Sequence, residues 1–279
     1  VKQLTSDLQA QSNEKVPLFI GIDEEGGDVV RMAEKLTPAP SQKEIGATGD
    51  IEQAKTWAIK TAKSLKDMGI NVNFAPVADV GSNDKRSYST DANTVIDFVR
   101  AATKGYQQEN IIYSLKHFPG IGKGKVDSHI DSSSIDVAKE VLMTEDILPF
   151  KTIIDESDPN DYFILVSHLK YLALDEEYPA SLSSKIMTDL LRNKLGYKGI
   201  IITDDMEMDA VANHNDFRSI GVKAVKAGAD IVLVCHEYKH QQEVYLGLLD
   251  AVNSGEISQE RIDESVKRII KVKLLHLYQ

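Results

Sequence analysis

The sequence predicts an α/β fold built around a parallel sheet. Short runs rich in Ile, Val, Leu and Phe recur along the 279 residues, and each run is apolar throughout rather than alternating with polar residues. Strands that are buried on both faces of a parallel sheet have this pattern. The predicted strands are Leu18–Asp23, Val72–Val80, Ile111–Phe118, Tyr162–His168, Gly199–Asp204 and Ala229–Cys235.

Amphipathic segments that can form helices lie between these runs. Asp50 is a suitable N-cap for a helix whose apolar residues follow the 3.6-residue period until Gly69 ends it. Ser183 can begin a second helix, and Ser258 can begin a last one. Alternation of strand and helix over this length predicts one domain, residues 1–279, that is either a barrel or a doubly wound sheet.

The composition excludes several classes of protein. The chain carries 32 basic and 43 acidic side chains, a net charge of −11, whereas a general nucleic-acid binder needs a basic face. No apolar run approaches the roughly 20 residues that cross a bilayer, so we expect no membrane span. The single cysteine, Cys235, excludes a disulfide framework and a zinc cluster of thiolates.

Charged or imidazole side chains follow five successive predicted strands. In both candidate architectures the active site lies beyond the carboxyl ends of the parallel strands. A helix cap or a core histidine would explain any one of these positions, but five at the same rim indicate a site. The residues are Asp23-Glu24-Glu25, Asp79, Lys116-His117, His168 and Asp204-Asp205.

A glycine-rich segment follows the third predicted strand. It lacks the spacing of a phosphate-binding loop, so we interpret it as a mobile loop with glycine hinges. Within it Asp127 and His129 are two residues apart, and in extended backbone the carboxylate can orient the imidazole and raise its basicity. A metal site made of Asp127, His129 and Asp131 is the alternative, although one flexible loop is a poor rigid set of ligands.

Several short motifs occur in order along the chain. They are Ile20-Gly21-Ile22-Asp23-Glu24-Glu25-Gly26-Gly27, Asn73-Phe74-Ala75-Pro76-Val77-Ala78-Asp79, Lys116-His117-Phe118-Pro119-Gly120, Asp127-Ser128-His129, Val166-Ser167-His168, Pro179-Ala180-Ser181-Leu182-Ser183, Leu195-Gly196-Tyr197-Lys198-Gly199 and Ile202-Thr203-Asp204-Asp205-Met206-Glu207-Met208. Together they resemble glycoside hydrolase family 3, and within it the bacterial β-N-acetylhexosaminidases that act on cell-wall fragments. The resemblance covers nearly the whole chain, and the combination is much more specific than any single motif.

The resemblance implies a TIM-type (β/α) barrel. Such a barrel has eight strands, and six are identified here. We therefore expect that the first strand and helix are missing from this chain and precede Val1 in the family. A barrel without its first strand has two open edges, which favours aggregation.

The resemblance also implies an activity. It is that of a retaining exo-β-N-acetylglucosaminidase, which forms a covalent glycosyl-aspartate on muropeptides during peptidoglycan turnover or on chitin-type saccharides. Asp204 matches the nucleophile, and such a carboxylate stabilises an oxocarbenium-like transition state. His129 matches the acid/base, with Asp127 as its orienting partner, because a histidine with a pKa near 6.5 can donate and then accept a proton at neutral pH.

The family's sugar-binding residues have counterparts here as well. Charge-assisted hydrogen bonds to sugar hydroxyls would come from residues that the resemblance places in the −1 subsite. These residues are Asp23, Arg86, Lys116 and His117, with His168 lining the same pocket. Arg86 could otherwise be an ordinary surface arginine. Ile121 stands where the family commonly has histidine and Asp28 where it commonly has arginine, which bears on leaving-group preference and loop dynamics.

Three other interpretations remain open at this point. The protein could be a glycoside phosphorylase of the same family, a barrel that binds amino sugars without turnover, or a metal-dependent lyase or aldolase. The resemblance implies a carbohydrate substrate, no cofactor and no metal, and we expect a monomer. Relatives of this kind act in the bacterial cytoplasm or are secreted to the cell envelope.

Overall fold

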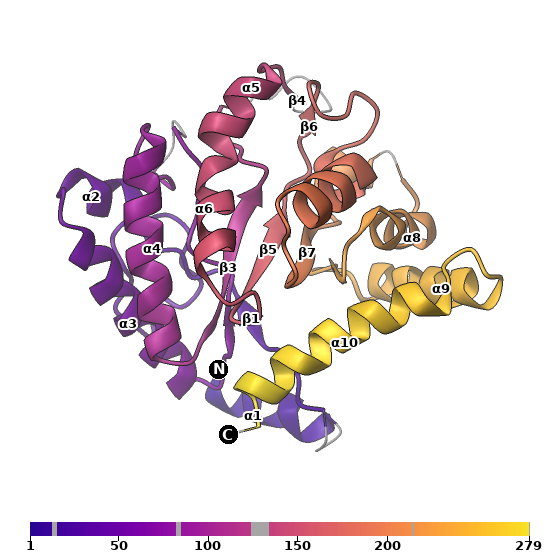
Figure 1. Ribbon diagram of the computed structural model, residues 1–279. Coiled ribbons are helices and arrows are strands. Elements are labelled where there is room, and N and C mark those ends of the chain that lie inside the picture. Colours follow the sequence, from indigo (N-terminus) through magenta and orange to yellow (C-terminus); the bar gives the residue numbers. More distant parts are fainter. Residues whose placement is uncertain (13–15, 82–84, 124–133, 214, 279) are drawn as a thin grey trace.

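The protein forms a curled parallel sheet with helices on its outer side (Figure 1). The structure, a computed structural model, describes residues 1–12, 16–81, 85–123, 134–213 and 215–278. All neighbouring strands of the six-stranded sheet pair in parallel. In spatial order the strands are β1 (Gly21–Ile22), β2 (Val72–Asn73), β3 (Ile112–Phe118), β5 (Tyr162–Val166), β7 (Ile200–Asp205) and β8 (Ile231–Leu233).

The order of the strands decides between the two predicted architectures. A doubly wound sheet reverses its strand order at a switch point. Here each strand of the main sheet lies beside the next one along the chain, from β1 to β8, so the sheet curls in one direction as part of a barrel. The expectation of an incomplete TIM-type barrel is therefore confirmed, with β1 and β8 as the edges of the described sheet.

All six predicted strands are confirmed, but three of them are much shorter than predicted. Of Ala229–Cys235, only Ile231–Leu233 forms β8. Only Gly21–Ile22 and Val72–Asn73 join the ladder as β1 and β2. The run that follows β2 contains Pro76, which has no amide N–H to donate to a neighbouring strand. Apolar content alone therefore predicted the position of these strands and overestimated their length.

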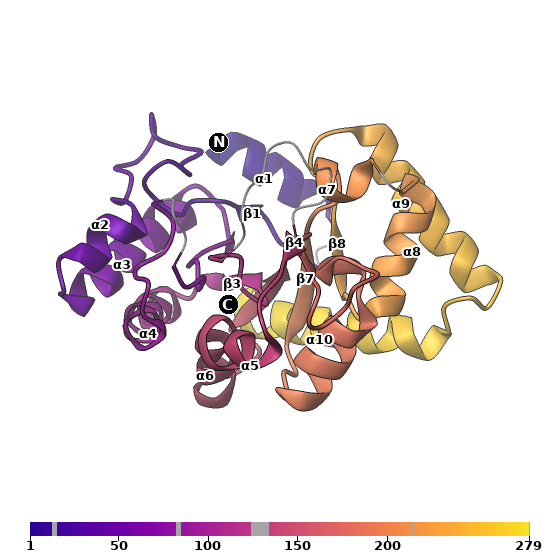
Figure 2. The same ribbon diagram turned by 90° about the horizontal axis from the view of Figure 1, so that it is seen from above.

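Helices surround the outer face of the sheet, from α3 and α4 on one side to α8 and α9 on the other (Figure 2). A small parallel sheet of β4 (Ser134–Ile135) and β6 (Lys170–Tyr171) lies apart from the main one. The α-helices are α1 (Lys2–Gln11), α2 (Gln42–Ala47), α3 (Ile51–Asp67), α4 (Ala92–Gln108), α5 (Lys139–Val141), α6 (Leu148–Glu156), α7 (Asp209–Ala212), α8 (Phe217–Ala227), α9 (Tyr238–Asn253) and α10 (Gln259–His276). Two helices of π type, η1 (Leu142–Asp146) and η3 (Lys185–Lys194), and the 3₁₀ turn η2 (Ala180–Leu182) complete the described elements.

The predicted helix starts are confirmed by their capping hydrogen bonds. The Asp50 side chain accepts the N–H of Glu52 at the start of α3, and the Ser258 hydroxyl accepts the N–H of Arg261 at the start of α10. The Ser183 hydroxyl accepts an N–H in the first turn of the segment that becomes η3. Each cap satisfies a backbone donor that has no partner within its own helix.

Apolar clusters cover both faces of the sheet. Ile112 and Ile200 belong to an inner cluster, which Val272 of α10 completes. The residues that follow them in their strands, Tyr113 and Ile201, belong to a larger outer cluster between the sheet and the surrounding helices. Because side chains alternate between the two faces of a strand, this explains why the predicted strands are apolar throughout.

The same alternation places three polar residues on the inner face. Lys116 and Asp204 each lie four residues after a member of the inner cluster in their own strands. Asp23 lies four residues after Phe19, which packs against that cluster. Since side chains two and four positions apart share a face, all three point towards the inside of the curl at its carboxyl end.

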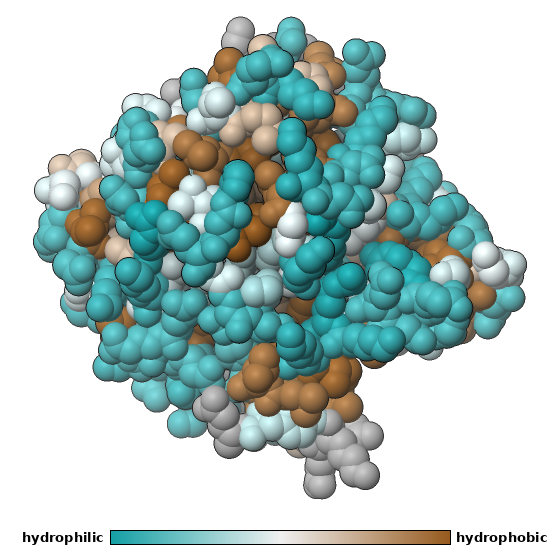
Figure 3. Space-filling model, viewed as in Figure 1, coloured by the Kyte–Doolittle hydropathy of each residue, from teal (hydrophilic) through white to brown (hydrophobic). Residues whose placement is uncertain are grey.

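Helix α10 crosses the opposite end of the sheet, at the amino ends of the strands (Figure 1). Its His276 bonds to the side chain of Asn110 at 2.8 Å and to the carbonyl of Asn160 at 3.1 Å, just before β3 and β5 respectively. Figure 3 shows an apolar area at the lower end of this face, where α1 and α10 lie. None of the helices in the described ranges is long and apolar enough to cross a membrane.

A buried carboxylate, that of Asp230, ties α10 to the sheet. It accepts the N–H of Ile201 at 3.0 Å and the hydroxyl of Ser265 at 2.6 Å. It also pairs with Arg268 at 2.9 Å and with Arg192. A carboxylate buried among arginines is stabilised only while all of these partners are present.

Replacing Asp230 by Asn should lower the free energy of unfolding by about 3–5 kcal/mol, because the substitution leaves partly buried arginines without their anion. Urea denaturation would measure the change. The control is Asp250→Asn, since the ion pair of Asp250 with Arg218 is exposed to solvent and should contribute less than about 1 kcal/mol. Similar small changes in both variants would contradict this account of the α10 attachment.

Candidate active site

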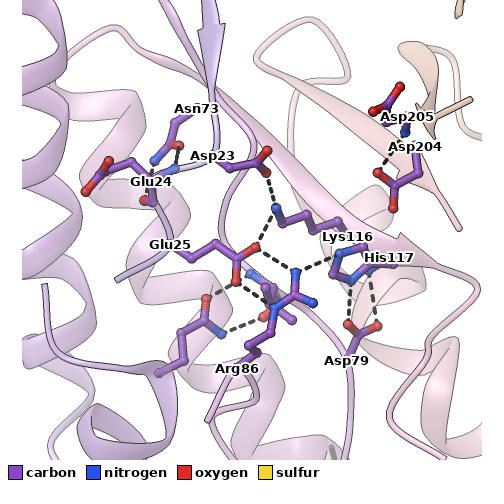
Figure 4. Close-up of polar contacts among 12 residues, drawn as sticks. Asp23, Glu24, Glu25, Asn73, Asp79, Arg86, Lys116, His117, Asp204 and Asp205 are labelled. Atoms are coloured by element: carbon purple, nitrogen blue, oxygen red, sulfur yellow. Dashed lines mark hydrogen bonds and ion pairs between the residues drawn. The ribbon is translucent and has the colours of Figure 1, made fainter. Parts of the chain in front are cut away.

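A buried lysine joins the ends of two strands at the carboxyl end of the sheet (Figure 4). The Nζ atom of Lys116, in β3, lies 2.5 Å from Oδ1 of Asp23 and 2.6 Å from Oε1 of Glu25. The side chains of Lys116 and Glu25 are almost fully buried, whereas that of Asp23 is 38% exposed. Asp23 is therefore the member of this group that a ligand can reach.

The segment after β1 is held in place by β2 and by a glycine turn. Asn73 accepts the N–H of Glu24 and donates to its carbonyl, both at 3.0 Å. Gly26 then has a φ of +97°, and a β carbon there would lie 2.6 Å from the carbonyl oxygen of Pro40. Only glycine fits this turn, which directs the Glu25 side chain back towards Lys116.

Arg86 forms a two-pronged ion pair with Glu25. Its Nε and Nη2 atoms lie 2.9 Å and 2.7 Å from the two carboxylate oxygens. Burial acts to raise the pKa of Glu25, but the charge of Lys116 and the hydrogen bonds and charge of Arg86 lower that pKa to about 2. Glu25 is thus a permanent anion, which excludes it as a proton donor near neutral pH.

His117 is held between Asp79 and Arg86. Its Nδ1 lies 2.8 Å from Oδ2 of Asp79, and its Nε2 lies 3.0 Å from Nη2 of Arg86. Because a guanidinium can only donate, Nε2 accepts a hydrogen bond from Arg86. The ring proton is therefore on Nδ1, which donates a hydrogen bond to Asp79. Asp79 also accepts the backbone N–H groups of His117 and Ile121, so it anchors the chain where it leaves β3.

Asp204 stands at the end of β7, on the inner face of the curl (Figure 4). It is half-buried, and its Oδ1 accepts the N–H of Asp205 at 2.9 Å. Its Oδ2 has no hydrogen-bond partner within the described part of the chain. Asp204 therefore presents one carboxylate oxygen to whatever occupies this end of the sheet.

The pKa of the Cys235 thiol is affected by the carboxylates at this end of the sheet. Cys235 is an exposed residue whose thiol is partly removed from water. This partial desolvation raises the pKa of Cys235 first, and the charges of Asp205, Asp23, Asp204 and Glu207 raise it further, to about 12. Asp23 and Asp204 therefore act on the same thiol, although 181 positions separate them in the sequence. The ends of β1, β7 and β8 converge on one negatively charged region.

His168, like Lys116 and His117, is an almost fully buried member of the predicted sugar-binding residues. Its Nδ1 lies 2.6 Å from the Ser181 hydroxyl and its Nε2 lies 2.8 Å from the backbone carbonyl of Asp205. It is 4% exposed, and burial lowers its pKa. The structure therefore brings His168 to the same end of the sheet, with both ring nitrogens already bonded to protein atoms.

The remaining predicted residues divide into two groups. Asp23, Arg86, Lys116 and His117 form one connected network, with Asp204 at the same end of the sheet. Asp127, His129 and Asp131 lie outside the described residues, so their roles stay predictions. The described residues hold no cluster of three or more His, Cys, Asp or Glu side chains suited to a metal ion.

Two members of the network, Glu25 and Asp79, received no role from the sequence. Both were present in strand-end motifs, and both bind side chains that were predicted to contact sugar. The signal that could have found them is the presence of Lys116, His117 and Arg86 among the predicted site residues. A buried lysine requires anionic partners, and Glu25 and Asp79 are acidic residues within the predicted strand-end motifs.

Residues 1–272 match the glycosyl hydrolase family 3 N-terminal domain. The chain belongs to glycosyl hydrolase family 3. It is 35% identical to beta-hexosaminidase A of Pseudoalteromonas piscicida over 97% of this chain and 50% of that protein, so it spans about half the length of this relative. The match confirms the predicted family resemblance.

Solved structures of other family 3 proteins superpose closely on this fold. A β-N-acetylglucosaminidase from Paenibacillus sp. gives a TM-score of 0.93 at 37% identity, covering 99% of this chain and 54% of that one. The β-N-acetylglucosaminidase of Thermotoga maritima gives 0.87 at 28% identity, covering 97% and 57%. The incomplete barrel of this chain is therefore the family 3 barrel.

Cys235 should react slowly with iodoacetamide although it is exposed. The thiolate is the reactive form, and a thiol with a pKa of about 12 is almost entirely protonated at pH 8. We expect alkylation roughly 100-fold slower than that of free cysteine at this pH, after allowing for the greater nucleophilicity of a more basic thiolate. Mass spectrometry across pH 7–11 should show a rate that still rises above pH 9, and a plateau below pH 9 would contradict the negative environment.

Proposed function

We propose that this protein is a retaining exo-β-N-acetylglucosaminidase. It would hydrolyse terminal β-linked N-acetylglucosamine from muropeptides or chitin-type saccharides through a covalent glycosyl-aspartate. The observation that carries the proposal is Asp204, whose carboxylate has one oxygen without a partner in the described part of the chain, at the same end of the sheet as the Asp23–Lys116 pair. The names of the relatives, beta-hexosaminidase and β-N-acetylglucosaminidase, support the same sugar.

Asp23 and Lys116 are suited to bind the hydroxyl groups of the sugar in the −1 subsite. Lys116 has three N–H donors, and Asp23 and Glu25 account for two of them. The third remains for a hydroxyl oxygen, and the partly exposed Asp23 can accept from a neighbouring hydroxyl. Arg86 and His117 hold Glu25 and Asp79 in the arrangement that keeps this pair in place.

Asp204 is the proposed nucleophile. Its Oδ1 is engaged by a backbone N–H, so Oδ2 would attack the anomeric carbon and form the covalent intermediate. The transition state carries positive charge on the sugar ring. The surrounding anions Asp23 and Asp205, whose charges also act on Cys235, favour that developing charge.

The acid/base role is assigned to His129, with Asp127 as its partner, from the family resemblance alone. Three described carboxylates at this end of the sheet, Glu25, Asp79 and Asp205, are held by protein donors. Glu25 and Asp79 are bound as described above, and Asp205 accepts two backbone N–H groups. Glu24 accepts the N–H groups of Arg31 and Met32 at Oε2, whereas its buried Oε1 has no partner among the described residues and burial raises its pKa.

Asp204→Asn should reduce kcat on an aryl N-acetyl-β-glucosaminide by roughly 10⁴-fold or more, because it removes a nucleophile needed only during reaction. Affinity for N-acetylglucosamine, measured by calorimetry, should change little. The matched control is Asp209→Asn, an exposed residue at the start of α7, which should retain full activity. A wild-type protein that binds the sugar without releasing the aryl group would instead be a binding module.

His129→Ala should slow the hydrolysis of substrates with poor leaving groups much more than that of activated aryl substrates, because only the former need a proton on the departing oxygen. Kinetics on alkyl and nitrophenyl N-acetyl-β-glucosaminides would measure the difference. Equal losses on both would count against an acid role.

Product analysis in phosphate buffer separates hydrolysis from phosphorolysis, since a phosphorylase would yield the sugar 1-phosphate.

A further inference from the structure

We propose that His168 is a positioning residue that orients the nucleophile Asp204 through the backbone of Asp205. This inference rests on the proposed function, because it concerns Asp204 as the attacking group. His168 follows β5, and Asp204 is the next to last residue of β7, the neighbouring strand, with Val166 and Thr203 in register shortly before them. The two residues therefore lie at the same end of neighbouring strands.

Hydrogen bonds to the carbonyl and to the N–H of Asp205 link the two residues through the backbone of Asp205. The Ser181 hydroxyl lies 2.6 Å from Nδ1 of His168, and Nε2 of His168 lies 2.8 Å from the carbonyl oxygen of Asp205. The N–H of Asp205 then lies 2.9 Å from Oδ1 of Asp204. A carbonyl oxygen can only accept, so Nε2 carries the proton and Nδ1 accepts from Ser181. The direction of each of these bonds is thereby determined.

Burial makes the histidine a rigid part of this arrangement. His168 is 4% exposed and Ser181 is fully buried. Burial also lowers the pKa of His168, so the ring stays neutral and keeps one donor and one acceptor at neutral pH. Turning the ring towards a bound sugar would break two buried hydrogen bonds, which costs more than a contact with a hydroxyl returns.

The side chain of Asp205 is restrained as well. Its Oδ1 accepts the N–H groups of Cys235 and Glu207 at 3.1 Å and 3.2 Å, and its Oδ2 lies 3.1 Å from Nε2 of His236. Asp205 is thus held at its carbonyl by β5 and at its carboxylate by the segment after β8. Its N–H, which engages Oδ1 of Asp204, therefore has a defined direction.

This arrangement leaves Oδ2 of Asp204 as the oxygen that faces the anomeric carbon. A displacement of about 1 Å in a reacting group can reduce the rate about 100-fold. A residue that only positions Asp204 should affect kcat and leave sugar affinity unchanged. A residue that binds sugar directly should affect KM and affinity, so the two roles are separable by measurement.

The test compares His168→Leu with His168→Gln in the full chain. Leucine removes the donor to Asp205, whereas the glutamine amide can place an N–H near the position of Nε2. We expect the leucine variant to lose about 100-fold in kcat on an aryl N-acetyl-β-glucosaminide and the glutamine variant less than about 10-fold. Affinity for N-acetylglucosamine should stay within about 3-fold in both variants.

The same substitutions in an Asp204→Ala background separate positioning from a general structural effect. Azide replaces the missing carboxylate there: it attacks the anomeric carbon, the bond to the aryl oxygen breaks, and the aryloxide leaves with glycosyl azide as the other product. With no carboxylate to orient, His168→Leu should change the azide-dependent rate by less than about 3-fold. A loss of about 100-fold in both backgrounds, or a loss of affinity with kcat unchanged, would overturn the proposal.

Ser181→Ala keeps the test decisive if the leucine variant does not fold, as judged by thermal unfolding. It removes only the hydroxyl that orients the ring, so a smaller loss in kcat with unchanged affinity is expected, and no loss at all would overturn the proposal.

The same variants distinguish a failure of the proposed function from a failure of the positioning role. If Asp204→Ala retains turnover without azide, Asp204 is not the nucleophile. If that variant is inactive while His168→Leu keeps full kcat, only the positioning role is wrong.

Discussion

The charge of one buried ammonium organises the candidate active site. Lys116 is almost completely removed from water, and a lysine there is stable only when anions surround it. Asp23 and Glu25 supply them from the segment after β1, so the ends of β1 and β3 are held together. Arg86 then balances the second of these anions. The loss of any member of this group would remove one of the charges that compensate its neighbours.

The carboxylates at this end of the sheet are of two kinds: those that are buried and bound to protein groups, and those that are partly exposed. Glu25 and Asp79 are buried and bound to cations or to backbone donors. Asp23 and Asp204 are the partly exposed carboxylates, and both add to the negative environment that acts on Cys235. Under the proposed function, Glu25 and Asp79 hold the other side chains of the site in place. Asp23 and Asp204 would contact the hydroxyls and the developing positive charge of the sugar.

Much of the fold could be predicted because its signals are local. Continuous apolar runs predicted all six strands of the main sheet, and Asp50, Ser183 and Ser258 predicted helix starts. Both signals depend only on residues that are close together in the sequence. Strand length was overestimated for β1, β2 and β8. The choice between a barrel and a doubly wound sheet was beyond these signals, because strand order depends on pairing between distant segments.

The sequence alone determined the α/β class, the positions of the strands and the end of the sheet at which Asp23, Lys116 and Asp204 gather. These follow from residue spacing, because a strand presents alternate side chains to one face. Only the tertiary structure decided that Glu25 and Asp79 complete the network and that His168 bonds to the backbone of Asp205. Partners of this kind are chosen by distance in space and by burial, and a linear pattern contains neither.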